Sequence, residues 1–137
     1  MARKKKKNPE EILQNAVADF LAGALRPPTT WTAFPAGGGG KIRGAKLKRM
    51  GLKPGWPDII VLHPMGLNTL FVGIELKAKK GRLSDAQAAT CEALWAANAR
   101  YVECRSLEEV DRCLRRAGVP LHGYVAGTRA SEQERAA

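Results

Sequence analysis

The sequence predicts a mixed α/β domain built on one central β-sheet that is flanked by helices. Its 137 residues, of which 45% are hydrophobic, suit a single domain with a real core. Segments with helical spacing of apolar residues alternate with short runs rich in branched and aromatic residues. We place the domain at residues 9–126, between a basic, disordered arm over 1–8 and a frayed tail over 127–137.

The first third of the chain predicts a helix, a strand and a second, shorter helix. Apolar residues recur three and four positions apart from Pro9 to about Leu25, with Asn8 as a cap and Pro9 in the first turn. The segment "RPPTT" ends this helix, and "WTAF" at 31–34 is typical of a strand. The glycine-rich run at 35–40 favours no regular structure, and a short helix follows around 45–50.

The middle of the chain predicts a β-hairpin. Branched residues indicate a buried strand over "PDIIVL" at 57–62, and a second strand follows at 69–78 after the turn-forming segment 64–68.

The last third predicts two helices that surround a strand at 100–104. The helices cover 84–99 and 106–118, and Gly118 ends the second. Each begins with a serine three residues before a glutamine or glutamate, which is the spacing of a capping box.

The net charge of +10 and the pI near 10.0 predict a polyanionic partner, either nucleic acid or an anionic membrane surface. No apolar run approaches the ~20 residues of a membrane span, and no apolar segment follows the basic N-terminus as in a secretory signal. Three cysteines without CxxC spacing argue against a disulfide framework or a zinc site, and favour small buried hydrophobes in a reducing compartment. We therefore expect a cytoplasmic protein.

A charged pair on the second hairpin strand is the first sign of chemistry. Side chains alternate along a strand, so Glu75 and Lys77 share one face while Ile74 and Leu76 share the other. A buried ion pair gains little stability, because desolvation offsets the Coulomb attraction. The pair is therefore better explained as part of a site.

The neighbouring strand supplies a second carboxylate. If the hairpin pairs around residue 66, Asp58 falls opposite Glu75, with about 5 Å between their Cβ atoms. Two carboxylates so close favour a bound Mg²⁺ or Mn²⁺, and the Leu76 carbonyl is a further candidate ligand. Such a metal suits phosphodiester hydrolysis, with Lys77 orienting the attacking hydroxide or stabilising the transition state. On spacing alone, an ordinary surface hairpin with a cross-strand ion pair remains an alternative.

The segment 41–53 carries six basic residues and no acid. The preceding "GGGGK" is not a Walker A motif, which would need Gly at 35 and Ser or Thr at 42, where the chain has Pro35 and Ile42. We expect the segment to lie along a DNA backbone; a merely solvated basic segment is the alternative. Its candidate phosphate contacts are Lys41, Arg43, Lys46, Lys48 and Arg49.

The stretch "GWPDIIVL…FVGIELKAKKGRLSDAQ" resembles the VRR-NUC (virus-type replication-repair nuclease) group of the PD-(D/E)xK nuclease superfamily. The matching features are Pro57-Asp58, Glu75-x-Lys77, the turn at 81–84, and Gln87. The lead "GAKLKRMGLKPGWPD" is similar to the family's approach to its first catalytic strand, and the resemblance covers roughly residues 10–105.

The resemblance implies a restriction-endonuclease-like core with Asp58 and Glu75 as metal ligands and Lys77 as the catalytic lysine. Gln87 would point from its helix into the site; its other possible role is that of capping partner for Ser84. The family also carries a glutamate on its first helix. Glu10 is our preferred match, and Glu11 and Asp19 are the alternatives.

The function that the resemblance implies is metal-dependent, structure-selective cleavage of branched DNA. Resolution of Holliday junctions by a two-fold homodimer is the leading expectation, in a bacterial or phage-infected cell. The helix at 84–99, with Trp95, is a candidate dimer contact, and plain core packing is its alternative. The alternatives to the function are a flap- or nick-directed nuclease, a non-catalytic nucleic-acid-binding protein of the same fold, and a membrane-surface protein that uses Lys4–Lys7.

Overall fold

The computed structural model describes residues 6, 8–34 and 40–123. The predicted arm over 1–8, apart from Lys6 and Asn8, and the predicted tail over 127–137 lie outside the described residues. Most of the glycine-rich run at 35–40 lies outside them too.

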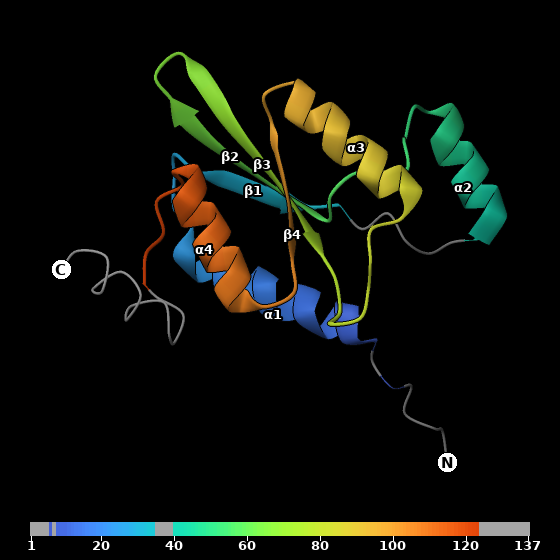
Figure 1. Cartoon of the computed structure of the whole chain (residues 1–137), viewed down its shortest axis with the longest axis horizontal. Coiled ribbons are helices and arrows are strands. Elements are labelled where there is room, and N and C mark those ends of the chain that lie inside the picture. Colours follow the sequence, from blue (N-terminus) through green and yellow to red (C-terminus); the bar gives the residue numbers. More distant parts are fainter. Residues whose placement is uncertain (1–5, 7, 35–39, 124–137) are drawn as a thin grey trace.

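Eight elements follow one another in the predicted order (Figure 1). They are α1 (Pro9–Ala24), β1 (Thr30–Ala33), α2 (Gly40–Arg49), β2 (Ile59–Met65), β3 (Asn68–Leu76), α3 (Asp85–Ala96), β4 (Arg100–Cys104) and α4 (Leu107–Ala117). The strands form one sheet in the order β1-β2-β3-β4. The β1–β2 and β2–β3 pairs are antiparallel and the β3–β4 pair is parallel, so the prediction of a central mixed sheet flanked by helices is confirmed.

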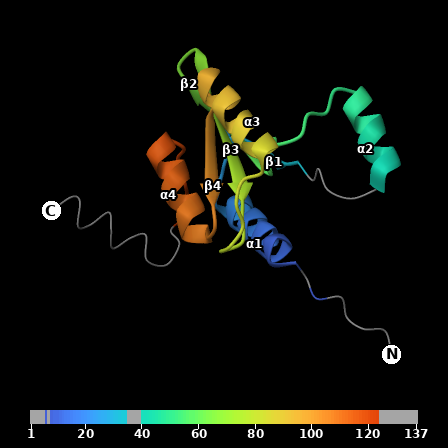
Figure 2. The same ribbon diagram turned by 45° about the vertical axis from the view of Figure 1, so that its right-hand side comes forward.

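The two faces of the sheet are covered unequally. Helices α1 and α4 pack together on one face, over a large apolar core that includes Val17, Leu21, Ile74 and Leu114. Helix α3 lies over the other face, where a smaller cluster forms around Leu94, Ala99 and Tyr101 (Figure 2). Because strand residues alternate, Ile74 and Leu76 enter the large core and Glu75 points to the α3 side.

Most boundaries lie within two residues of the prediction, but α3 ends at Ala96 rather than 99, and β3 ends at Leu76 rather than 78, so Lys77 follows the strand. Helix α2 begins at Gly40 rather than near 45, because Lys41 and Arg43 are good helix formers that extend it toward the N-terminus. Strand β2 continues through Pro64 to Met65, so the hairpin turn shortens to Gly66 and Leu67, with Gly66 at φ +61°. Pro64 is tolerated because β1 pairs with β2 only as far as Leu62, which leaves that edge free at the proline.

The turn over 54–57 is held tightly against both β3 and α3. A Cβ on Gly73 would lie 2.5 Å from Cγ of Pro57, and a Cβ on Gly55, whose φ is +88°, would lie 2.3 Å from the Ala86 carbonyl oxygen. The Thr90 hydroxyl also donates to the Pro54 carbonyl at 3.2 Å. These close approaches fix the position at which the chain enters β2.

Helix α2 stands apart from the layered core (Figures 1 and 2). Leu47 is its one half-buried side chain among those described. No helix among the described residues is long and apolar enough to cross a membrane.

We expect Gly73→Ala to lower the free energy of unfolding by about 1–3 kcal/mol, because the added methyl overlaps the Pro57 ring in a packed region. Urea denaturation measures the change. The control is Gly23→Ala in α1, where nothing lies within 4 Å of the added methyl; alanine should raise stability there by about 0.5–1 kcal/mol. Equal stability of the two variants would contradict the proposed close packing of Pro57 on β3.

Candidate active site

Asp58 and Glu75 meet at one end of the β2–β3 hairpin. The pairing runs from Met65↔Asn68 to Ile59↔Ile74, and one further step sets Asp58 opposite Glu75. Asp58 lies just before β2, where its carbonyl accepts from the Phe34 amide at 2.7 Å and its Oδ2 accepts from the Leu76 amide at 2.8 Å. The antiparallel register expected from the sequence is thus confirmed, and it places both carboxylates on the α3 side of the sheet.

Glu75 is almost completely buried, with 3% of its surface exposed. Three side chains surround its carboxylate. The Lys77 ammonium lies 3.7 Å from Oε1, and Gln87 Nε2 donates to the same oxygen at 2.6 Å. The Tyr101 hydroxyl donates to Oε2 at 3.4 Å. An ordinary surface hairpin with an exposed ion pair does not fit this burial.

Gln87 serves both of the roles that the sequence analysis kept open. Its Oε1 accepts from the Ser84 amide at 2.9 Å, and the Ser84 hydroxyl accepts from the Gln87 amide at 3.2 Å, which completes the capping box of α3. Its Nε2 is left to donate to Glu75. The helix cap therefore fixes the position of the amide group that reaches into the site.

Among the three candidate carboxylates on α1, Glu10 is the one that approaches the site. It is half-buried, whereas Glu11 and Asp19 are exposed. A Cβ on Gly81 would lie 3.4 Å from both Glu10 Oε1 and Lys77 Cδ, so the glutamate and the lysine flank the same glycine. The negative charge of Glu10 also raises the pKa values of Asp58 and Glu75. Its participation in catalysis stays a prediction.

Burial, followed by nearby negative charge, raises the pKa values of both carboxylates. Burial, followed by the charge of Asp58, raises the pKa of Glu75 from 4.5 to about 7, against the opposing attraction of Lys77. Burial also raises the pKa of Asp58, although the Leu76 amide and Lys77 act in the opposite direction. Desolvation, followed by the charge of Glu75, raises the pKa of Tyr101 as well.

The donor set fits a hard divalent cation. The described residues hold no group of three or more histidines, cysteines, aspartates and glutamates arranged around one metal position. Mg²⁺, however, is commonly bound through one or two carboxylates, with water and substrate phosphate completing the shell. Asp58 and Glu75 meet that requirement, because a cation beside them would stabilise the ionised forms that burial and neighbouring negative charge disfavour. The Leu76 carbonyl stays a predicted ligand.

Tyr101 is a residue of the site that the sequence did not predict. Its hydroxyl lies 3.4 Å from both the Gly55 carbonyl oxygen and Glu75 Oε2, so its one proton is shared between two acceptors and links the 54–57 turn to the site. The signal was the alternation in "RYVEC", which puts residues 101 and 103 on one face. That signal becomes informative only when β4 is known to pair with β3, where Glu103 stands beside Glu75.

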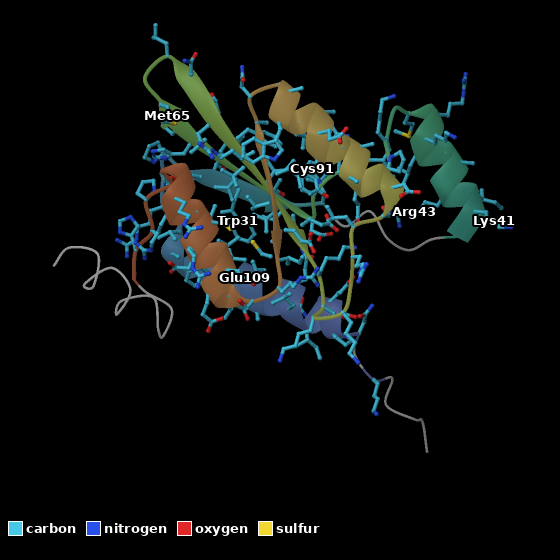
Figure 3. The ribbon with its side chains drawn as sticks, in the orientation of Figure 1. Trp31, Lys41, Arg43, Met65, Cys91 and Glu109 are labelled. Carbon is cyan, nitrogen blue, oxygen red and sulfur yellow. The ribbon has the colours of Figure 1, made fainter. Side chains whose placement is uncertain are left out.

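The predicted DNA-binding residues all lie on α2, with exposed side chains (Figure 3). They are Lys41, Arg43, Lys46, Lys48 and Arg49. A groove of about 600 Å³ separates this helix from the 54–57 turn, and Pro57 lines it immediately before Asp58. The basic helix and the carboxylate pair are therefore joined through one short turn.

The model of the VRR-NUC domain family matches residues 39–108, just over half of the chain. The chain belongs to the VRR-NUC family. The matched segment contains Asp58, Glu75, Lys77 and Gln87, whereas Glu10 lies outside it.

Comparison with solved structures supports the fold of this VRR-NUC domain. A structure described as a VRR_NUC domain protein is 21% identical, with a TM-score of 0.65 over 83% of this chain and 91% of the other. Comparison with curated proteins found no match. The family and the fold are thus those of a nuclease-type domain.

In the absence of metal, we expect the stability of the protein to fall as the pH rises from about 4.5 to 7. Over this interval the folded protein retains a proton on Glu75 that the unfolded chain has released. The loss attributable to Glu75 is about 3 kcal/mol at most. Denaturant unfolding in EDTA across this pH range measures it.

Glu75→Gln should flatten this pH dependence, because the amide does not titrate yet still accepts from Gln87. Glu108→Gln, which changes an exposed glutamate of α4, is the control and should leave the slope unchanged. Added Mg²⁺ should raise the melting temperature of the wild type more at high pH than at low pH. Equal slopes in all three proteins would show that Glu75 does not titrate in this range.

Proposed function

We propose that this protein is a metal-dependent endonuclease that hydrolyses phosphodiester bonds in branched DNA, with the Holliday junction as its leading substrate. One observation carries the proposal. A buried glutamate, Glu75, is set opposite Asp58 and contacted by Lys77 and Gln87 at one end of the sheet. An arrangement this costly to bury is typical of a catalytic site rather than of a structural ion pair.

Each residue of the site has a role that its contacts support. The Leu76 amide holds Asp58, and Gln87 holds Glu75, so both carboxylates present fixed oxygen donors. A divalent cation bound between them would offset charge on the phosphate and acidify water. The Lys77 side chain is 12% exposed, and its ammonium would stabilise negative charge developing on the phosphate.

The exposed cations of α2 support a backbone-directed mode of DNA binding. Contacts from lysine and arginine to phosphates carry affinity without reading the sequence. We therefore propose selection by DNA structure rather than by base sequence. A symmetric junction would further require a homodimer, in which each copy cuts one strand.

The face of α3 that is turned away from the sheet is our candidate for the dimer contact. Leu94 is the one buried residue of α3 and packs toward the sheet beside Tyr101, while Trp95 remains 48% exposed. The Trp95 indole donates to the Tyr101 carbonyl at 3.2 Å, so part of the ring packs within the subunit. The half that remains exposed would be available to a second copy.

We expect the purified protein to cut a labelled four-way DNA junction in Mg²⁺ or Mn²⁺ but not in EDTA. Lys77→Ala should lower the rate by at least about 100-fold, as the loss of one group that stabilises the transition state does. Lys80→Ala, which removes an exposed lysine from the same loop, should cut normally. Gel analysis of strand-specific products reports whether the cuts are symmetric, and light scattering reports whether the protein is a dimer.

The outcomes of this experiment are distinct. Paired symmetric cuts by a dimer would support junction resolution. Cuts confined to flaps or nicks would keep the chemistry and change the substrate. Tight binding without cleavage in either metal would contradict the nuclease proposal and support a non-catalytic DNA-binding protein of the same fold.

We also expect Lys46→Ala with Arg49→Ala to weaken binding to branched and linear DNA alike. The plot of log K against log salt should become shallower by about one unit for each phosphate contact that is removed. Fluorescence anisotropy in EDTA over a range of salt concentrations measures both effects. Arg112→Ala with Arg116→Ala, on the exposed side of α4, is the charge-matched control. Equal changes in the two double variants would show a general effect of net charge rather than contacts from α2.

A further inference from the structure

The groove between α2 and the 54–57 turn combines an apolar lining with a basic rim. Its apolar surface comes chiefly from Phe34, Leu47, Leu52 and Trp56, together with prolines 54 and 57. Its charged residues are Arg43, Lys48 and Lys53. A second hollow of about 340 Å³ shares Phe34, Leu52, Lys53 and Trp56 with the first. The two aromatic rings therefore stand where the hollows meet.

The aromatic side chains of this groove are unusually open to solvent. Phe34 is 49% exposed and Trp56 is 45% exposed, and Leu52 beside them is 42% exposed. A cluster of large apolar side chains left half in water marks a binding surface, since the protein gains nothing by exposing it. No element of the described chain covers these rings, which leaves them open to contact with another molecule.

We propose that this groove binds a nucleobase from an unpaired strand of DNA, stacked on Trp56. A nucleotide carries a flat apolar ring and a negative charge in one unit, and the groove offers an aromatic surface and cations together. The segment 41–53 has six basic residues and no acid, so an anionic partner is favoured over a neutral apolar peptide. The inference rests on the proposed DNA substrate and narrows it to DNA in which a nucleotide near the cut is unpaired or can leave its pair, as at a branch point.

The position of the groove connects base binding to the candidate active site. Pro57 lines the groove and the next residue, Asp58, holds its carboxylate in the site. Gly55 also lines the groove, and its carbonyl accepts from the Tyr101 hydroxyl that contacts Glu75. A nucleotide seated on Trp56 would therefore contact the turn that positions the carboxylates. A base that is paired and stacked within a duplex could not enter the groove, whereas a base at a branch point or a single-stranded end could.

The test compares two fluorescent oligomers of equal length and equal phosphate count, measured by anisotropy in EDTA. One is an oligothymidylate, and the other carries abasic tetrahydrofuran residues in place of the thymidines. The wild type should bind the oligothymidylate about tenfold more tightly, as expected for the stacking of one base. Trp56→Ala should lose this preference while keeping the wild-type affinity for the abasic oligomer. Trp56→Phe, which retains an aromatic ring, should recover most of it.

Two further variants guard the interpretation. Leu52→Arg fills the groove but adds a positive charge, so it should reduce the preference for bases without weakening the binding of the abasic oligomer. Met65→Ala removes another half-exposed apolar side chain, at the far end of the β2–β3 hairpin, and should leave the preference unchanged (Figure 3). Circular dichroism of each variant verifies its fold.

Several results would overturn the inference. Equal affinity of the wild type for both oligomers excludes base binding. If Trp56→Ala loses affinity equally for both oligomers, Trp56 contacts the DNA backbone or supports the fold rather than binding a base. If Trp56→Ala dissociates a dimer and leaves the base preference unchanged, the groove is a contact between two copies of the protein. Absence of binding to either oligomer also overturns the inference and leaves the branched substrate to the junction experiment, whereas a base preference without any cleavage in Mg²⁺ defeats only the catalytic proposal.

Discussion

The antiparallel pairing of β2 with β3 determines where the two candidate metal-binding carboxylates lie. Its register sets Asp58 across from Glu75, and the alternation of strand residues turns Glu75 away from the large core and toward α3. A slip of one residue would send Glu75 into the apolar layer beneath α1 and α4. The two-residue turn at Gly66 and the packing of Pro57 on Gly73 both hold this register.

The burial of Glu75 explains why polar side chains surround its carboxylate. A carboxylate with 3% exposure would be unstable beside apolar groups alone, so the fold supplies a lysine, an amide and a phenol around it. These contacts do not restore the ordinary pKa of Glu75, because burial, followed by the charge of Asp58, raises that pKa further than they lower it. The carboxylates of the site therefore favour the binding of a cation. The raised pKa of Glu75 makes that binding depend on pH, because the cation competes with a proton.

The molecule divides its tasks between a rigid core and a peripheral basic helix. The sheet and α3 fix the carboxylates, the lysine and the amide, while α2 carries exposed cations and one wall of an aromatic groove. The turn at 54–57 joins the two parts, since it lines the groove, packs on β3 and α3, and leads directly into Asp58. The turn at 54–57 would thus connect the residues that bind the DNA strand to the residues proposed to cut it.

Sequence alone determined the order of the elements and the hairpin register, because strand alternation, turn residues and capping boxes are local signals. It also predicted a site that contains Asp58, Glu75, Lys77 and Gln87, whose catalytic roles stay predictions. Tertiary structure decided what depends on contacts between distant segments. The choice of Glu10 over Glu11 and Asp19 needed the packing of α1 beside residues 77–81. Tyr101 became part of the site only through the parallel pairing of β4 with β3, and the groove exists only because α2 stands away from the turn that follows it. No local pattern encodes such long-range proximity, since it arises from how separate faces bury their apolar surface together.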